Sequence, residues 1–333
     1  MVQCSIVVDC LLFLHLERFT VLNAKILRSH IFVAICWAFP WVGCAAQSSH
    51  HTSDKPATEL RNQDRDVRPR IQRAIDMHFH VFFEGELEGG FKNLEHMQKS
   101  IGAIVSDPRI KKVGMIVIAP EDLETTKKQN DFILESSKEN DKFFPIASVH
   151  PAQGKEALLE IERVVKAGAK MLKLHQNTQK FDLENPMVSK IITESTDRGI
   201  PILFEGTTFV DKNTVKKLFE LAIKHPKARL VLAHMGGIAF REMLVFALFK
   251  KYPWWPNNVY FDISYTAAAF ANSPMRDELV YVIREVGVDR VMFGSDYPLH
   301  QPGEALDALE SMGFTEEELD AIAYGTAKTL LDL

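Results

Sequence analysis

Eight short apolar runs, each followed by a longer amphipathic segment, recur from residue 71 to the end of the chain. Runs rich in valine and isoleucine predict buried strands, and the amphipathic segments predict helices that cover a sheet. Eight strand–helix units in roughly 260 residues are typical of a (β/α)8 barrel. We therefore predict an α/β protein with one (β/α)8 TIM barrel over 71–333. The predicted strands are 74–82, 113–119, 144–150, 169–175, 202–205, 230–234, 259–264 and 291–296. The clearest predicted helices are 155–167, 185–198, 214–225 and 275–286.

The composition limits the partners and the metal chemistry of this barrel. The chain has a net charge of -5 and no run of lysine or arginine, so it lacks the basic surface of a nucleic-acid-binding protein. Its four cysteines all lie before residue 45. The barrel therefore contains no disulfide and no thiolate, and a metal ion there would need nitrogen and oxygen ligands.

Residues 1–43 predict a targeting segment. The apolar run 31–43 follows Arg28 and His30, and its length suits the core of a signal peptide better than a membrane span. An earlier apolar stretch, 5–16, is unusual for such a signal; a start codon placed too far upstream would explain it, and a transmembrane anchor is the alternative.

The apolar run ends in Val42-Gly43-Cys44-Ala45, which resembles a bacterial lipobox with Trp41 where leucine is usual. We expect acylation of Cys44; the alternative is ordinary secretory cleavage after a small residue. Residues 44–70 are polar with no apolar period, which predicts a flexible linker. The expected location is the cell envelope, with the protein lipid-anchored and facing the periplasm.

Titratable residues stand at the carboxyl ends of six of the eight predicted strands. In the first strand, a period of two places Asp76, His78 and His80 on one side. The same period places Ile75, Met77 and Phe79 on the other side. The residues at the other strand ends are His150, Lys173, His175, Glu205, His234 and Asp296. Reactive groups of (β/α)8 barrels gather at this end, and unpaired burial of each would cost several kcal/mol. We expect these side chains to satisfy one another or a cation.

Four motifs resemble, in order and spacing, those of the amidohydrolase superfamily: 76–80, 168–175, 230–237 and 293–298. The most similar branch is the amidohydrolase-related group that includes aminocarboxymuconate-semialdehyde decarboxylase and pyrone-dicarboxylate lactonase. The last segment, 325–331, also resembles the final helix of that group, with Thr326 where asparagine is usual.

The resemblance implies a divalent metal ion, most often zinc, with manganese or iron as alternatives. His78 and His80 would bind it. Asp296 would be a metal ligand, a general base or both, and His234 would be a ligand or the group that polarises the substrate. Asp296 and His234 are thus the expected catalytic residues.

Glu205 departs from the pattern, because the family commonly has histidine there. A carboxylate can still bind a metal ion through oxygen, and it would shift the preference towards manganese or iron. The alternatives are an ion pair with Lys173, or a carboxylated Lys173 that bridges two metal ions. We favour a single ion with Glu205 near it.

Five further residues are expected to contact the substrate or to support the ligands. They are Lys173, His175, His150, Asp76 and Arg241. Arg241 is the candidate to bind a substrate carboxylate, while Phe82 and Phe83 are candidates for an apolar wall.

The leading functional hypothesis is a metal-dependent hydrolase that activates water on the cation to cleave a C–N or C–O bond of a small substrate. The alternatives are a metal-dependent decarboxylase on the same site and a non-catalytic binding lipoprotein of the envelope. The expected partners are a small-molecule substrate and, only through the lipid anchor, a membrane. The oligomeric state stays open, with a homodimer as one option.

Overall fold

The computed structural model describes residues 70–83 and 94–333, all within one compact unit, 60–333. The targeting segment 1–43, Cys44 and the linker up to residue 69 lie outside the described residues, so the predictions made for them stay predictions. Within the described ranges, no helix has the length and apolar character needed to cross a membrane.

Eight parallel strands pair in sequence order. They are β1 (Ala74–His80), β2 (Ile110–Ile116), β3 (Phe143–Ser148), β4 (Met171–Leu174), β5 (Ile202–Phe204), β6 (Leu230–Leu232), β7 (Val259–Asp262) and β8 (Val291–Met292). The segment that follows β8 pairs with β1, because Asp296 N donates to His78 O at 2.8 Å and His80 N donates to Tyr297 O at 3.2 Å. The sheet thereby closes on itself, and the predicted (β/α)8 barrel is confirmed.

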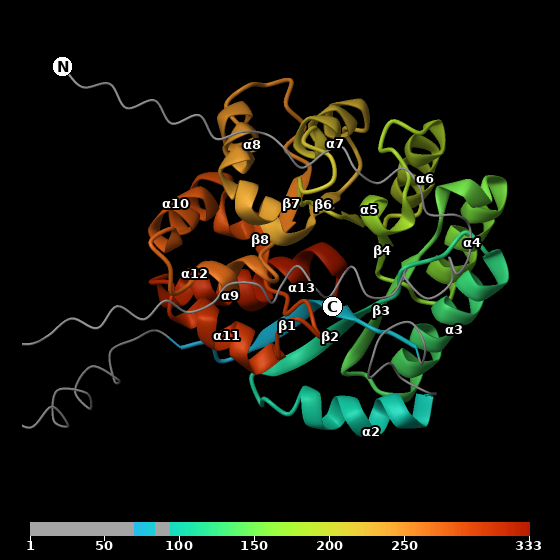
Figure 1. Ribbon diagram of the computed structural model, residues 1–333, viewed down its shortest axis with the longest axis horizontal. Coiled ribbons are helices and arrows are strands. Elements are labelled where there is room, and N and C mark those ends of the chain that lie inside the picture. Colours follow the sequence, from blue (N-terminus) through green and yellow to red (C-terminus); the bar gives the residue numbers. More distant parts are fainter. Residues whose placement is uncertain (1–69, 84–93) are drawn as a thin grey trace, which may run out of the picture. The chain divides into compact units, whose positions relative to one another are not determined.

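Helices surround the strands (Figure 1). The longer ones are α2 (Leu94–Ile104), α3 (Leu123–Glu139), α4 (Lys155–Lys166), α6 (Pro186–Asp197), α7 (Thr214–Lys224), α10 (Arg276–Val286) and α11 (Pro302–Glu310). The shorter ones are α5 (Gln176–Gln179), α8 (Leu244–Phe249), α9 (Thr266–Phe270), α12 (Glu316–Asp320) and α13 (Thr326–Leu331). Between them lie the 3₁₀ segments η1 (Pro151–Gln153), η2 (Ala233–Met243) and η3 (Val288–Arg290) and the π-helical segment η4 (Ala321–Gly325). The four predicted helices agree with α4, α6, α7 and α10 to within one residue at each end. Local signals explain this agreement: Asn185 caps the first turn of α6, and Pro186 opens it.

The core has two layers. Side chains from the sheet and from α13 fill the inside of the barrel together: Ile75, Met77, Ile116, Phe144, Ile146, Met171, Leu203, Val231, Ala233, Met292, Ala327, Leu330 and Leu331. A larger layer lies between the strands and the helices. Lys170 and Arg229, which precede β4 and β6, donate to the carbonyls of Asp332 and Leu330, so α13 closes the amino end of the barrel.

A bulge in β1 corrects the predicted alternation. The pairing moves from Asp76–Val113 to Phe79–Met115, so three residues of β1 lie opposite two of β2. Ile75 and Met77 belong to the barrel interior, whereas Phe79 packs in the outer layer. The prediction that these three share one side is therefore wrong, because the extra residue shifts the phase of the strand. His78 thus follows Met77 into the barrel.

The predicted strands run too far at their carboxyl ends. β5, β6 and β8 end at Phe204, Leu232 and Met292, so the polar residues predicted to end these strands lie in the turns that follow. His234 and Asp296 both have φ near 59°, in the left-handed region, where a strand cannot continue. Such backbone conformations in residues other than glycine gather at functional sites.

Candidate metal centre and active site

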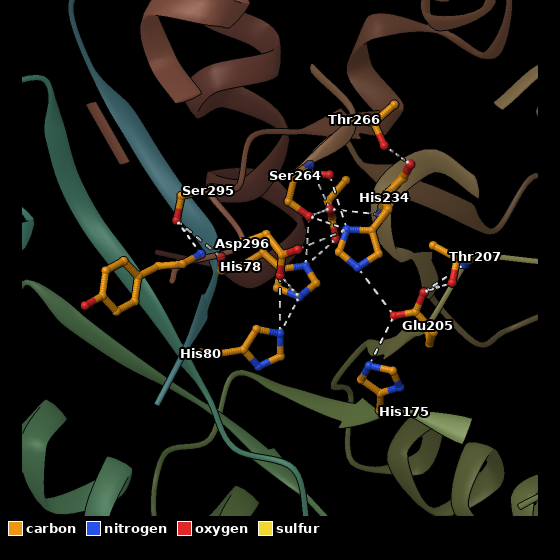
Figure 2. Close-up of polar contacts among 12 residues, drawn as sticks. His78, His80, His175, Glu205, Thr207, His234, Ser264, Thr266, Ser295 and Asp296 are labelled. Carbon is orange, nitrogen blue, oxygen red and sulfur yellow. Dashed lines mark hydrogen bonds and ion pairs between the residues drawn. The ribbon is translucent and has the colours of Figure 1, made fainter. Parts of the chain in front are cut away.

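Three side chains meet at the mouth of the barrel (Figure 2). His78 Nε2 lies 3.1 Å from His80 Nε2, and Asp296 Oδ1 lies 3.5 Å and 3.4 Å from these two nitrogens. All three side chains are buried. The two histidines come from β1 and the aspartate from the turn after β8, so the closure of the barrel brings the two ends of the domain together.

The triangle fits the ligands of one divalent cation. Ligand atoms at about 2.0–2.2 Å from a tetrahedral ion lie about 3.4 Å apart, close to the three observed separations. Two imidazole nitrogens at 3.1 Å also repel each other if both present lone pairs, unless a proton or a cation lies between them. His78, His80 and Asp296 could therefore hold a metal ion, and His78, His234 and Asp262 form a second group of ligand-type atoms.

Asp262 and Ser264 lie within hydrogen-bond distance of the Nδ1 atoms of the histidines. Asp262 Oδ2 accepts from His78 Nδ1 at 3.0 Å, and Ser264 Oγ lies 3.1 Å from His78 Nδ1 and 3.0 Å from His234 Nδ1. The sequence prediction does not include either residue. A signal was present nonetheless, since both stand at the end of the seventh predicted strand, like the site residues of the other strands.

Glu205 lies beside the triangle rather than in it. Its Oε1 accepts from Thr207 N at 2.9 Å and from Thr207 Oγ1 at 2.6 Å. Its Oε2 lies 3.4 Å from both His175 Nε2 and His234 Nε2. Glu205 is not in either group of ligand-type atoms found among the described residues. It instead carries a negative charge next to two imidazoles.

The suggested ion pair between Glu205 and Lys173 is not formed. Lys173 is fully buried, and within the described part of the chain its Nζ has no hydrogen-bond partner. Burial lowers the pKa of Lys173, while the carboxylates of Glu205 and Asp262 oppose that shift. The amine thus lies among several carboxylates without a direct contact.

The charges around the triangle favour the protonation states that a metal ion needs. Burial lowers the pKa of His78 to about 4, which leaves its imidazole neutral at pH 7. Burial alone would raise the pKa of Asp296, but the imidazoles of His234 and His80 bring it below its ordinary range. A neutral imidazole and an ionised carboxylate are the forms that bind metal ions.

The pKa of His234 shifts in the opposite direction to that of His78. Burial alone would lower its pKa, but the carboxylates of Glu205 and Asp296 raise it to about 10. The pKa of Glu205 is lowered well below its ordinary value, because the attraction of His234 outweighs burial. The ring of His234 stacks on that of His78 with 4.9 Å between centroids, so the carboxylates that raise the pKa of His234 act on a ring directly beside the triangle.

The other predicted residues lie at different distances from this centre. Asp76 Oδ1 accepts from Ser295 N at 2.9 Å and from His78 N at 3.2 Å, and so ties β1 to the turn after β8. Burial raises the pKa of Asp76 to about 7. His150 uses both ring nitrogens on backbone groups, Gln179 O and Ala152 N, and therefore supports a loop.

The structure does not bring Arg241 to the centre. Its guanidinium is exposed and pairs with Glu278 of α10. Aromatic side chains lie closer: Phe82 stacks on His80 with 5.5 Å between centroids, and Tyr265 meets His234 edge-on at 6.3 Å. Phe83 instead packs against Phe132. Tyr265 is a further residue that the sequence prediction does not include.

Comparison with known proteins agrees with this geometry. A family model described as amidohydrolase matches residues 75–333. The gamma-resorcylate decarboxylase of Polaromonas sp. strain JS666 is 23% identical over 329 residues, which cover 86% of this chain and 94% of that protein.

Solved structures share the fold. A dihydroxybenzoic acid decarboxylase from Polaromonas sp. JS666, with bound manganese and the inhibitor 2-nitroresorcinol, is 19% identical, with a TM-score of 0.61 over 79% of this chain and 97% of that chain. The 5-carboxyvanillate decarboxylase from Sphingomonas paucimobilis is 17% identical, with a TM-score of 0.60 over 79% of this chain and 99% of that chain. The resemblance predicted from four motifs is confirmed, and the chain belongs to the amidohydrolase family.

Proposed function

We propose that this protein is a metal-dependent decarboxylase of a small aromatic carboxylic acid. The observation that carries the proposal is the convergence of His78, His80 and Asp296 into a triangle of ligand atoms, with His234 stacked beside it. The relatives named above are decarboxylases, which favours the alternative from the sequence over hydrolysis. Manganese is the first metal to test, because one relative binds it.

A divalent cation, when bound, would polarise a substrate oxygen and offset negative charge. The chain itself supplies rigid positions for its ligands, because His78 and His80 lie on a strand and the backbone of Asp296 is bonded to His78 O. The ring of Phe82 stacks on that of His80, and Tyr265 stands at the edge of His234. Aromatic side chains beside the site can pack against the ring of a planar substrate.

Decarboxylation needs a proton on the ring carbon that carries the carboxylate. His234 is the group to deliver it, since Glu205 and Asp296 favour its protonated form. The bond to the carboxylate carbon then breaks, its electron pair returns to the ring, and carbon dioxide leaves. Glu205 Oε2, 3.4 Å from His234 Nε2, keeps a negative charge beside the ring that delivers the proton.

The test uses the full-length protein, freed of metal with a chelator and reloaded with Mn²⁺ or Zn²⁺. We expect release of carbon dioxide from 2,6-dihydroxybenzoate or 5-carboxyvanillate that depends on the added metal and is lost in His80→Ala. A protein that binds no divalent metal, or that cleaves lactones or esters but decarboxylates none of these acids, would contradict the proposal.

The location of the enzyme rests on the sequence alone. We propose export to the cell envelope with acylation at Cys44, which mass spectrometry of the protein purified from membranes would test. An unmodified amino terminus that retains residues 1–43 would contradict it.

A further inference from the structure

We propose that Asp262 and Ser264 form a positioning pair that sets which ring nitrogen of His78 and of His234 points into the site. The proposal rests on the metal centre of the proposed function. It concerns Asp262 and Ser264, to which that function gives no role in binding metal or substrate. Both residues are fully buried, at 0% exposure; Asp262 is the last residue of β7, and Ser264 lies two positions beyond it.

The hydroxyl of Ser264 has only one proton to give. Ser264 Oγ donates this proton to Asp262 Oδ1, because an ionised carboxylate can only accept. The lone pairs of the hydroxyl are then left for the two imidazole nitrogens at 3.0 Å and 3.1 Å, His234 Nδ1 and His78 Nδ1. Both Nδ1 atoms must therefore carry hydrogen.

This requirement sets the orientation of His78. Its Nδ1–H donates to Asp262 Oδ2 at 3.0 Å and to Ser264 Oγ, so its lone pair is on Nε2. Nε2 is the atom that lies 3.1 Å from His80 Nε2 and 3.5 Å from Asp296 Oδ1. A carboxylate behind a metal-binding imidazole holds the ring and raises its basicity in this way.

The same hydroxyl orients His234. Its Nδ1–H is directed to Ser264, whose carbonyl oxygen lies at 3.2 Å, and this leaves Nε2 facing Glu205 Oε2 at 3.4 Å. The backbone N of His234 also donates to Asp262 Oδ1 at 3.1 Å, which ties the left-handed turn after β6 to β7. One serine thus fixes Nδ1 as the nitrogen that faces β7 and carries hydrogen, in both the metal-binding and the proton-carrying histidine.

The packing leaves little freedom for another arrangement. A Cβ added at Gly294 would lie 2.6 Å from His78 Cβ and 3.0 Å from Ser264 Cβ, so the chain after β8 packs closely against both residues. Ser264 Oγ also lies among the ligand-type atoms of His78, His234 and Asp262. These three are therefore joined by a hydroxyl rather than arranged around a second cation.

The experiment compares Ser264→Ala and Asp262→Asn with wild type and with Ser195→Ala. Ser195 is an equally buried serine whose hydroxyl donates only to Ile191 O within α6, so it controls for the loss of a buried hydroxyl. Mn²⁺ affinity is measured by equilibrium dialysis. The ring tautomers are measured by NMR of ¹⁵N-histidine-labelled protein, metal-free and Zn²⁺-loaded.

We expect Ser264→Ala to weaken Mn²⁺ binding about 10- to 100-fold and to change the Nδ1 signals of both histidines, while Ser195→Ala does neither. Asp262→Asn should weaken binding more, because its amide would donate to His78 Nδ1 and move the hydrogen to Nε2. Should Ser264→Ala fail to fold, Ser264→Cys keeps the volume with a weaker hydrogen bond.

Mn²⁺ affinity within twofold of wild type together with unchanged tautomers in both variants would overturn the positioning pair. If wild type binds no metal, the proposed function fails instead, and the tautomers of the metal-free protein still decide whether the pair orients the rings. Two Mn²⁺ ions per chain in wild type would also overturn it, since Ser264 would then have to leave its place.

Discussion

The two halves of the barrel interior belong to the same strands, but their side chains differ: those of the amino half are apolar and those of the carboxyl half are charged or polar. In the amino half, Leu203, Val231 and Met292 fill the space and are fully buried in an apolar cluster. In the carboxyl half, residues at most four positions further along each chain segment are Glu205, His234 and Asp296. The interior side chains therefore change from apolar to charged within about four residues along each of these three segments.

In the part of the chain that the structure describes, the carboxyl half also contains buried polar atoms without hydrogen-bond partners and unfavourable backbone conformations. Among the described residues, Lys173 Nζ, Asp76 Oδ2 and His80 Nδ1 are buried without a hydrogen-bond partner, and His234 and Asp296 have left-handed backbones. Each such feature costs stability, and such costs are typical of functional sites. The comparison indicates that stability comes from the amino half and chemistry from the carboxyl half, as in other barrels of this type.

The sharpest way to break this comparison is to change one residue of each half. Asp296→Asn should lower decarboxylation on the order of 10³-fold or more, because it removes an ionised ligand of the triangle. Leu203→Ala should leave metal affinity unchanged and lower the free energy of unfolding by about 2–5 kcal/mol, because it leaves a cavity in the core. Urea denaturation and metal-dependent turnover measure the two effects.

The division between the halves would be contradicted if Asp296→Asn kept full turnover. It would also be contradicted if Leu203→Ala lost metal affinity in proportion to its stability.

Two glycines sharpen the comparison further. A Cβ at Gly294 would lie 2.6 Å from His78 Cβ, whereas a Cβ at Gly114 of β2 would lie 2.6 Å from the Phe144 ring. Overpacking costs about 1–3 kcal/mol in either place. We expect Gly294→Ala to weaken Mn²⁺ binding as well, while Gly114→Ala lowers only the thermal midpoint. Gly102→Ala, at an exposed position of α2 with nothing within 4 Å of the added atom, is the control: it should leave metal affinity unchanged and raise the thermal midpoint, because alanine favours a helix over glycine. Equal metal affinities in Gly294→Ala and Gly114→Ala would show that the mouth adjusts as freely as the core.

The halves also differ in how far the sequence could predict them. The apolar rhythm predicts all eight strands and the helices α4, α6, α7 and α10, because periodicity and caps are local signals. His78, His80 and Asp296 could be placed at one end of the barrel because its topology requires it. The bulge at Met77–His78 could not be predicted, since it depends on how β1 pairs with β2.

The partners of Glu205 show the same limit. The charge of Lys173 suggested an ion pair, but the histidines at 3.4 Å, His175 and His234, are its neighbours, and this choice depends on side-chain directions in three separate loops. Asp262 and Ser264 were overlooked for a related reason. Their place at the end of the seventh predicted strand was a signal, but their contacts to His78 and His234 join residues at least 28 positions apart, which no local pattern shows.

The smallest predicted effect lies outside both halves, at Lys217 on α7. Its Nζ lies 2.9 Å from both Asp182 Oδ1 and Asp211 Oδ2, on the surface of the helical layer. Exposed pairs of this kind contribute about 1 kcal/mol or less, so Lys217→Met should lower the free energy of unfolding by no more than that and leave metal affinity unchanged. High salt should reduce the difference.

The pH dependence of this pair has a definite sign. Backbone hydrogen bonds, from Glu184 to Asp182 and from Asn213 to Asp211, and then Lys217 itself lower the pKa values of both carboxyls in the folded protein. A lowered pKa in the folded state stabilises the protein above the unfolded value of about 3.9, and that contribution is lost as the pH falls through the folded value. The difference in the free energy of unfolding between wild type and Lys217→Met, measured by urea denaturation, should therefore be constant between about pH 5 and about pH 8 and shrink below about pH 4. A difference that grew in acid would contradict the lowered pKa values of the two carboxyls. A difference as large as the effect of Leu203→Ala would mean that the helical surface contributes as much to stability as the amino half of the barrel.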